Sequence, residues 1–99
     1  MTSLAIVRHT PIIYSRDDIA RRLRFVVMRE LAIPHLRITD NKDFVGDLGA
    51  DSLDMVSLPA ALENEFDVQI SDDEVAFCKT VGTAIDVITA KLENERRVA

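Results

Sequence analysis

The chain has 99 residues, of which 47% are hydrophobic and 29% are charged, and its net charge is −5. These proportions are those of a folded globular chain and exclude an intrinsically disordered one. With only three glycines, three prolines and 5% aromatic residues, the composition favours helices over a turn-rich β fold. The longest early apolar run, residues 4–7, is far shorter than the roughly 20 residues of a membrane span, so we expect no membrane insertion.

The charge is distributed unevenly along the chain. Residues 1–39 hold seven arginines against three acidic residues, whereas residues 40–76 hold eleven acidic residues against a single lysine. An acidic middle argues against nucleic-acid binding, which requires a basic surface. It is either a solvated acidic face or a landing patch for basic partners.

The first helix is predicted for residues 16–31. Ser15 is suited to its N-cap, with Asp18 as an acid in the first turn, and Pro34 closes it. Apolar residues recur at helical spacing along this segment: Ile19, Leu23, Val26, Val27 and Leu31. The preceding residues 1–14 lack the basic start and long apolar core of a signal peptide. We therefore expect them to be an N-terminal extension of a cytoplasmic protein.

A long polar connection follows the first helix. It covers residues 32–50 and is interrupted by Pro34, Gly46 and Gly49. The connection also carries apolar residues, which we expect to hold it against the core: Leu36, Ile38, Phe44, Val45 and Leu48.

Three further helices are predicted after this connection. The second begins near Ser52, the capping pair Ser71 and Glu74 opens a third that runs to about Phe77, and Thr80 caps the fourth. The second and fourth helices carry apolar stripes, formed by Met55, Leu58, Leu62 and Phe66 in one and by Val81, Ile85, Ile88 and Leu92 in the other. The predicted fold is all-α: a four-helix bundle with a long loop between the first two helices and a short third helix. We expect this domain to cover residues 15–92, with residues 93–99 as a C-terminal tail.

The segment "GADSLD", residues 49–54, places Ser52 between two aspartates at the predicted start of the second helix. A serine nucleophile needs a base to take its proton, and both histidines, His9 and His35, precede Ser52 in the chain. Hydrolases with a comparable Gly-Asp-Ser-Leu block place their histidine late, and this chain is too short for an α/β-hydrolase sheet. A small serine hydrolase is therefore a remote alternative, and Ser52 is better suited to be an attachment point.

Residues 44–74, "FVGDLGADSLDMVSLPAALENEFDVQISDDE", resemble the centre of an acyl carrier protein, and "TVGTAIDVI", residues 80–88, resembles the last helix of that family. The resemblance implies a non-catalytic carrier in which Ser52 bears 4′-phosphopantetheine, transferred from coenzyme A by a phosphopantetheinyl transferase. The thiol of this arm would hold an acyl group as a thioester, for fatty-acid synthesis or for a specialised lipid or secondary-metabolite pathway. An aminoacyl, peptidyl or polyketide carrier on the same scaffold remains an alternative.

The resemblance also implies roles for the residues around Ser52. Recognition by the basic docking surfaces of the transferase and of acyl-loading and acyl-transfer enzymes is assigned to Asp51, Leu53, Asp54, Val56, Glu63 and Glu65. The cleft that shelters the acyl chain, or the core beneath it, is assigned to Phe44, Leu48, Met55, Leu58, Leu62 and Ile70. We expect Glu63 and Glu65 to point mostly outward and Leu53 to lie off the buried stripe.

Elementary electrostatics supports the attachment at Ser52. A phosphate at a helix start faces free N–H groups and the positive end of the helix dipole. Asp51 and Asp54 would repel that phosphate, so we interpret them as contacts for a basic transferase. We expect a monomer without a metal site, and for the single cysteine, Cys78, a buried thiol rather than a reactive one.

Pro59 is the main departure from the family pattern. A proline inside a helix removes one backbone hydrogen bond and crowds the preceding turn, at a cost of about 3 kcal/mol. We therefore expect the second helix to bend or open at this point. Ser57, Ala60 and Asn64 also replace residues that family members use for partner contact. Our hypothesis is that Pro59 reshapes the cleft or the docking face for a specialised pathway.

Overall fold

The computed structural model describes residues 15–98 and, within them, the side chains of residues 15–94. Its first element, helix α2, covers Arg16–Leu31. The predicted cap is confirmed, because the N–H of Asp18 donates to Ser15 Oγ at 3.1 Å and the N–H of Ser15 donates to Asp18 Oδ2 at 3.3 Å. This reciprocal pair satisfies two N–H groups that the first turn of a helix leaves without partners. Helix α2 ends at Ala32, which adopts the left-handed conformation with φ 55°.

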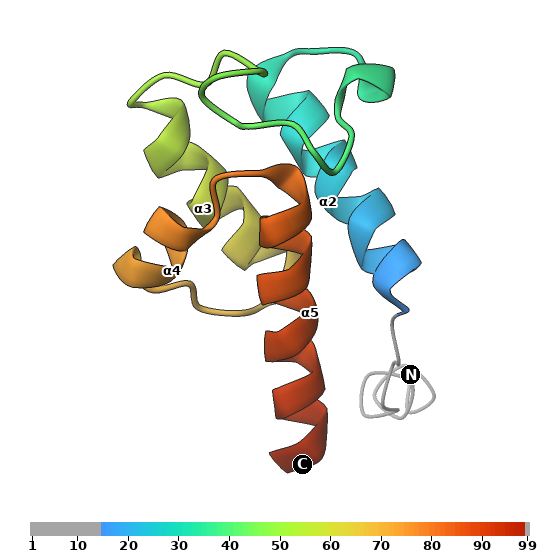
Figure 1. Cartoon of the computed structure of the whole chain (residues 1–99). Coiled ribbons are helices and arrows are strands. Elements are labelled where there is room, and N and C mark those ends of the chain that lie inside the picture. Colours follow the sequence, from blue (N-terminus) through green and yellow to red (C-terminus); the bar gives the residue numbers. More distant parts are fainter. Residues whose placement is uncertain (1–14, 99) are drawn as a thin grey trace, which may run out of the picture.

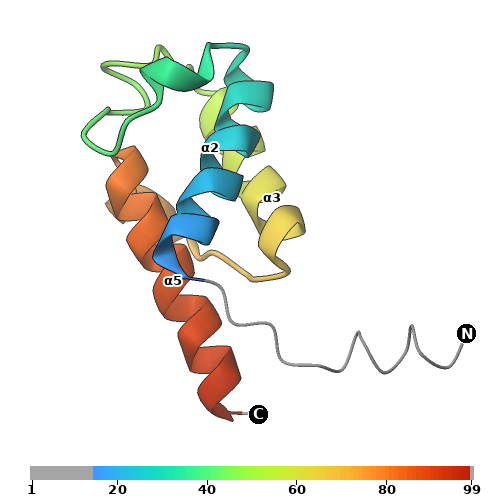
Figure 2. The same cartoon turned by 90° about the vertical axis from the view of Figure 1, so that its right-hand side faces the viewer.

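Three more α-helices follow in the described residues: α3 (Asp54–Phe66), α4 (Asp72–Phe77) and α5 (Val81–Val98). Figures 1 and 2 show α2 lying against α3 and α5, and Figure 1 shows the short α4 beside α3 and α5. The facing stripes of these helices meet in one apolar core, and the side chains of Ile19, Leu23, Val26, Val27, Leu58, Leu62, Phe66, Val81, Ile85 and Ile88 are buried there. The predicted all-α fold with four helices and a short third helix is confirmed.

The long connection between α2 and α3 reaches the core through fewer side chains than predicted. Ile38, Phe44 and Leu48 are buried, but Leu36 is 91% exposed and Val45 is 57% exposed, so the predicted burial of these last two is wrong. Leu36 lies in the outward 3-10 turn η1 (His35–Arg37). Val45 lies in a tight turn, in which its N–H donates to the carboxylate of Asp43 at 3.0 Å, and this turn directs the side chain away from the core.

Backbone hydrogen bonds fix this connection to the start of α5. The N–H of Phe44 donates to the carbonyl of Lys79 at 3.0 Å, and the N–H of Gly82 donates to the carbonyl of Asp40 at 2.8 Å. Glycine permits this close approach at position 82, because a Cβ there would lie only 3.1 Å from the carbonyl oxygen of Asp40. The connection that leads to Ser52 is thus held by a segment from the other half of the chain.

The second half of the chain follows the predicted capping pattern. At α4 the N–H of Ser71 donates to the carboxylate of Glu74 at 2.9 Å, and Lys91 of α5 forms an ion pair with the same carboxylate at 2.9 Å. These contacts lower the pKa of Glu74. We expected residues 93–99 to form a tail, but α5 continues to Val98. None of the helices in residues 15–98 is sufficiently long and apolar to cross a lipid bilayer.

Candidate functional site

Ser52 lies on the surface, where the long connection becomes α3. The regular part of α3 begins at Asp54, but helical hydrogen bonding starts earlier, because the N–H of Met55 donates to the carbonyl of Asp51 at 3.0 Å. Ser52 is therefore the first residue inside the opening turn. Its side chain is exposed, and its hydroxyl has no hydrogen-bond partner within the described part of the chain. Such a hydroxyl is accessible, but no neighbouring group activates it as a nucleophile.

The two aspartates that flank Ser52 cap this turn together. The N–H of Asp54 donates to Asp51 Oδ1 at 2.8 Å, and the N–H of Asp51 donates to Asp54 Oδ2 at 3.0 Å. The interpretation of both aspartates as partner contacts omitted this structural role, although the spacing Asp-x-x-Asp is that of a capping box. Because Asp51 already binds the N–H of Asp54, only the N–H groups of Ser52 and Leu53 lack an acceptor among the described residues of this turn.

The other four predicted partner-recognition residues divide into two groups. Leu53 and Val56 are 75% and 72% exposed beside Ser52, which confirms that Leu53 lies off the buried stripe. Glu63 and Glu65 are only partly exposed and make contacts within the molecule. The N–H of Ile70 donates to the carboxylate of Glu63 at 2.7 Å. The expectation that both glutamates point mostly outward is wrong, because folding provides partners for their carboxylates.

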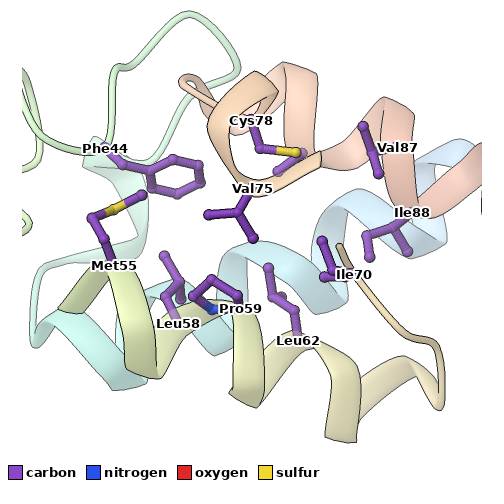
Figure 3. Close-up of a pocket in the computed structure, with 11 residues that line it drawn as sticks. Phe44, Met55, Leu58, Pro59, Leu62, Ile70, Val75, Cys78, Val87 and Ile88 are labelled. Atoms are coloured by element: carbon purple, nitrogen blue, oxygen red, sulfur yellow. The ribbon is translucent and has the colours of Figure 1, made fainter. Parts of the chain in front are cut away.

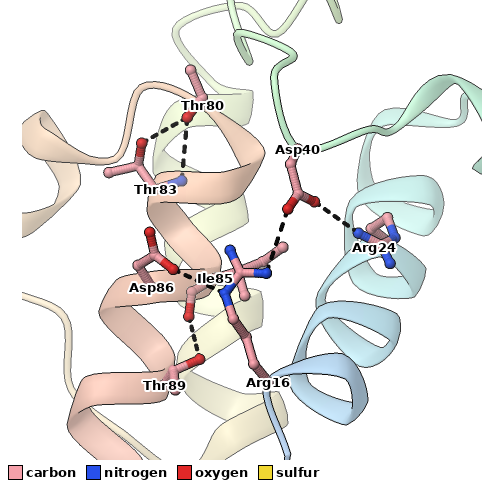
Figure 4. Close-up of polar contacts among 8 residues, drawn as sticks. All are labelled: Arg16, Arg24, Asp40, Thr80, Thr83, Ile85, Asp86 and Thr89. Carbon is pink, nitrogen blue, oxygen red and sulfur yellow. Dashed lines mark hydrogen bonds and ion pairs between the residues drawn. The ribbon is translucent and has the colours of Figure 1, made fainter.

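Arginines of α2 bind carboxylates of other elements, including that of Glu65. Arg22 donates to the carboxylate of Glu65 at 3.0 Å, and its guanidinium lies 4.8 Å from the ring centroid of Phe66, so it joins α2 to the end of α3. Figure 4 shows a second group, in which Asp40 binds both Arg16 and Arg24. Arg16, Arg22 and Arg24 therefore join α2 to other elements of the fold, whereas Arg21 and Arg29 form ion pairs within α2.

A small apolar cavity lies between α3, α4 and α5 (Figure 3), with a volume of about 30 Å³. Five of the six predicted cleft residues line it, namely Phe44, Met55, Leu58, Leu62 and Ile70. Leu48 does not line the cavity and is buried elsewhere in the core. Pro59, for which the sequence left the cleft and the docking face open, also lines the cavity. The sequence did not assign the remaining lining residues to the cleft, because they come from elements whose packing is set only by the fold: Val75, Cys78, Ala84, Val87 and Ile88.

Pro59 and Cys78 both contribute to the cavity wall. We expected α3 to bend or open at Pro59. The helix continues without a break through this residue, so the opening is wrong, whereas the bend stays a prediction. The burial of Leu58 and Leu62 on either side of the proline holds the two turns in place. Cys78 is about half-buried, and burial, with the carboxylate of Glu74 as a smaller cause, raises the pKa of its thiol. A raised pKa favours the unreactive thiol over the thiolate.

Comparisons with known proteins agree with this geometry. The family profile described as "Phosphopantetheine attachment site" matches residues 21–88. The acyl carrier proteins of two Caulobacter vibrioides strains, NA1000 / CB15N and ATCC 19089 / CIP 103742 / CB 15, are each 45% identical over 75 residues, which cover 76% of this chain and 96% of the relative. A solved structure of the acyl carrier protein from Enterococcus faecalis matches with a TM-score of 0.67 at 28% identity, over 79% of this chain and 99% of that one.

Proposed function

Because this chain belongs to the acyl carrier protein family and is a non-catalytic carrier with a phosphopantetheine attachment site, we propose that Ser52 is the residue to which 4′-phosphopantetheine is attached. The exposed, unpartnered hydroxyl of Ser52 at the start of α3 carries this assignment. A modifying enzyme can reach this hydroxyl, and the enzyme rather than the chain must activate it.

The residues around Ser52 fit the phosphate of such an arm. The N–H groups of Ser52 and Leu53 have no acceptor in the described part of the chain, and the opening turn of a helix favours an anion. Asp51 and Asp54 oppose this attraction, but their carboxylates are bound to backbone N–H groups of the same turn. The arm supplies a thiol that holds the acyl group as a thioester, whereas the polypeptide determines where the arm is attached.

We further propose that the cargo is an apolar acyl chain. Every residue that lines the cavity is apolar apart from the thiol of Cys78, so a hydrocarbon gains free energy by entering it. A charged aminoacyl group would lose its hydration there without gaining a partner. The partners are a phosphopantetheinyl transferase and the acyl-loading enzymes that use a carrier of this family. The cytoplasmic location and the basic character of the partner surfaces stay predictions.

The attachment is tested with two serine variants. Apo-protein incubated with coenzyme A, Mg²⁺ and a carrier-protein transferase should gain the mass of one arm. Ser52→Ala should gain none, whereas Ser57→Ala, which removes another exposed serine of the same helix, should be modified like the wild type. Modification of Ser52→Ala, or its loss in Ser57→Ala alone, would contradict the assignment.

A further inference from the structure

The apolar cavity adjoins a second groove on the surface. Phe44, Met55, Val75 and Cys78 line both the cavity and this groove, which lies between residues 43–46 and the end of α4. These four side chains therefore form the partition between the cavity and the groove. Met55 follows Ser52 by less than one helical turn, so the partition lies beside the attachment position.

A backbone hydrogen bond joins the two edges of the groove beside this partition. The N–H of Phe44 donates to the carbonyl of Lys79 at 3.0 Å, which ties one edge of the groove to the other. An entering chain must therefore displace side chains rather than spread the backbone. Met55 is well suited to this, because its unbranched thioether has three rotatable bonds.

Among the cavity-lining residues of α3, Pro59 is the one whose side chain cannot change rotamer to make room. Figure 3 shows its ring in the wall of the cavity, between Leu58 and Leu62. A cavity of about 30 Å³ has room for little more than one water-sized group, so a hydrocarbon fits only if the surrounding side chains rotate. Met55 and Leu62 can change rotamer. The ring of Pro59 is bonded to its own backbone nitrogen and cannot rotate away.

We propose that Pro59 limits the depth to which the acyl chain enters, and that it thereby determines chain-length specificity. This inference rests on the proposed function. Met55 and Pro59 are one turn apart on α3, about 6 Å along the helix axis. An extended hydrocarbon with C–C bonds of about 1.5 Å spans that distance with roughly five carbons. Carbons beyond this length stay in the groove or in the solvent.

The chain contains one cysteine, which makes the depth of entry measurable. The protein is loaded at Ser52 with amide-linked analogues of acyl-pantetheine of increasing length, so that Cys78 is the single free thiol. Its alkylation rate is then followed by mass spectrometry. Each methylene that enters the cavity should favour the inserted state, and slow alkylation, by about fourfold. In the wild type this decrease should level off at roughly five carbons past the partition.

Two variants at position 59 distinguish the effect of side-chain size from the effect of the missing backbone N–H. Pro59→Ala removes the ring and should move the plateau to longer chains. Pro59→Val restores the missing N–H but keeps a side chain of similar bulk, which is nearly locked in a helix, and should keep the wild-type plateau. Circular dichroism confirms that both variants are folded.

The outcomes are distinguishable. A failure to load the wild type at all would overturn the proposed function. A loaded protein whose Cys78 reacts equally fast at every chain length would show that no chain passes this partition, and would overturn the inference alone. The inference is also overturned if Pro59→Ala keeps the wild-type plateau, or if Pro59→Val shifts it as far as Pro59→Ala does.

Discussion

Replacing Asp51 with alanine tests whether this residue holds the attachment turn together or serves only as a charge. The variant loses the carboxylate that accepts the N–H of Asp54 at 2.8 Å, while the opposite bond of the pair can remain. Loss of an N-cap side chain costs about 1 kcal/mol, within a range of roughly 0.5–2 kcal/mol. For a domain of this size, that loss lowers the midpoint of thermal unfolding by about 4–8 °C.

Asp51→Asn is the matched control, because an amide oxygen caps a helix as well as a carboxylate does. Thermal unfolding followed by circular dichroism should give wild-type stability for Asp51→Asn and a lower midpoint for Asp51→Ala. The rate of modification by the transferase, measured on the same proteins, should separate the two roles. If the modification rate falls only in Asp51→Ala, the transferase depends on the capped turn. If the rate falls equally in Asp51→Ala and Asp51→Asn, the transferase depends on the negative charge. Equal stability of all three proteins would refute the capping argument.

Three further predictions concern other parts of the chain. Leu53→Ala and Leu36→Ala each remove an exposed leucine, so both should leave stability within about 0.5 kcal/mol of the wild type, but only Leu53→Ala should slow modification of Ser52. The fold lowers the pKa of Glu74 from its ordinary value of 4.5, so the carboxylate stabilises the folded state above pH 4.5 and this contribution is lost as the pH falls below 4.5. In thermal unfolding, Glu74→Gln should therefore lose less stability than the wild type over this pH range. Gly82→Ala should destabilise the protein in urea by about 1–3 kcal/mol, although the same change in an open helix would stabilise it.

The local features of the fold could be predicted from the sequence. A capping box depends on two residues three apart, and both Ser15 with Asp18 and Ser71 with Glu74 form the predicted pairs. The apolar stripes of the helices can be predicted for the same reason, since helical periodicity is a short-range property. Asp51 and Asp54 carry the same signal, but their charge suggests partner contact as a sufficient explanation and so obscures the cap.

Features that depend on contacts between distant segments could not be predicted in this way. Leu36 and Val45 are as apolar as their buried neighbours, and only the direction of two turns places them outside. The partner of Glu65 is an arginine on another helix, which no spacing along the sequence indicates. Pro59 could be recognised as unusual, but whether it faces the cleft or the docking surface depends on how α3 is rotated against α4 and α5.

The hydrogen bonds between the long connection and the start of α5 have a consequence for the order of folding. Ser52 comes before α5 in the chain, yet the connection that positions it is held by the carbonyl of Lys79 and the N–H of Gly82. Contacts between distant segments form late, because the loop between them must first be closed at a cost in entropy. The attachment turn therefore reaches its final position only after the last helix has docked. A transferase that recognises this turn would select finished molecules over nascent or truncated chains, so that the costly arm is added to carriers that are ready for use.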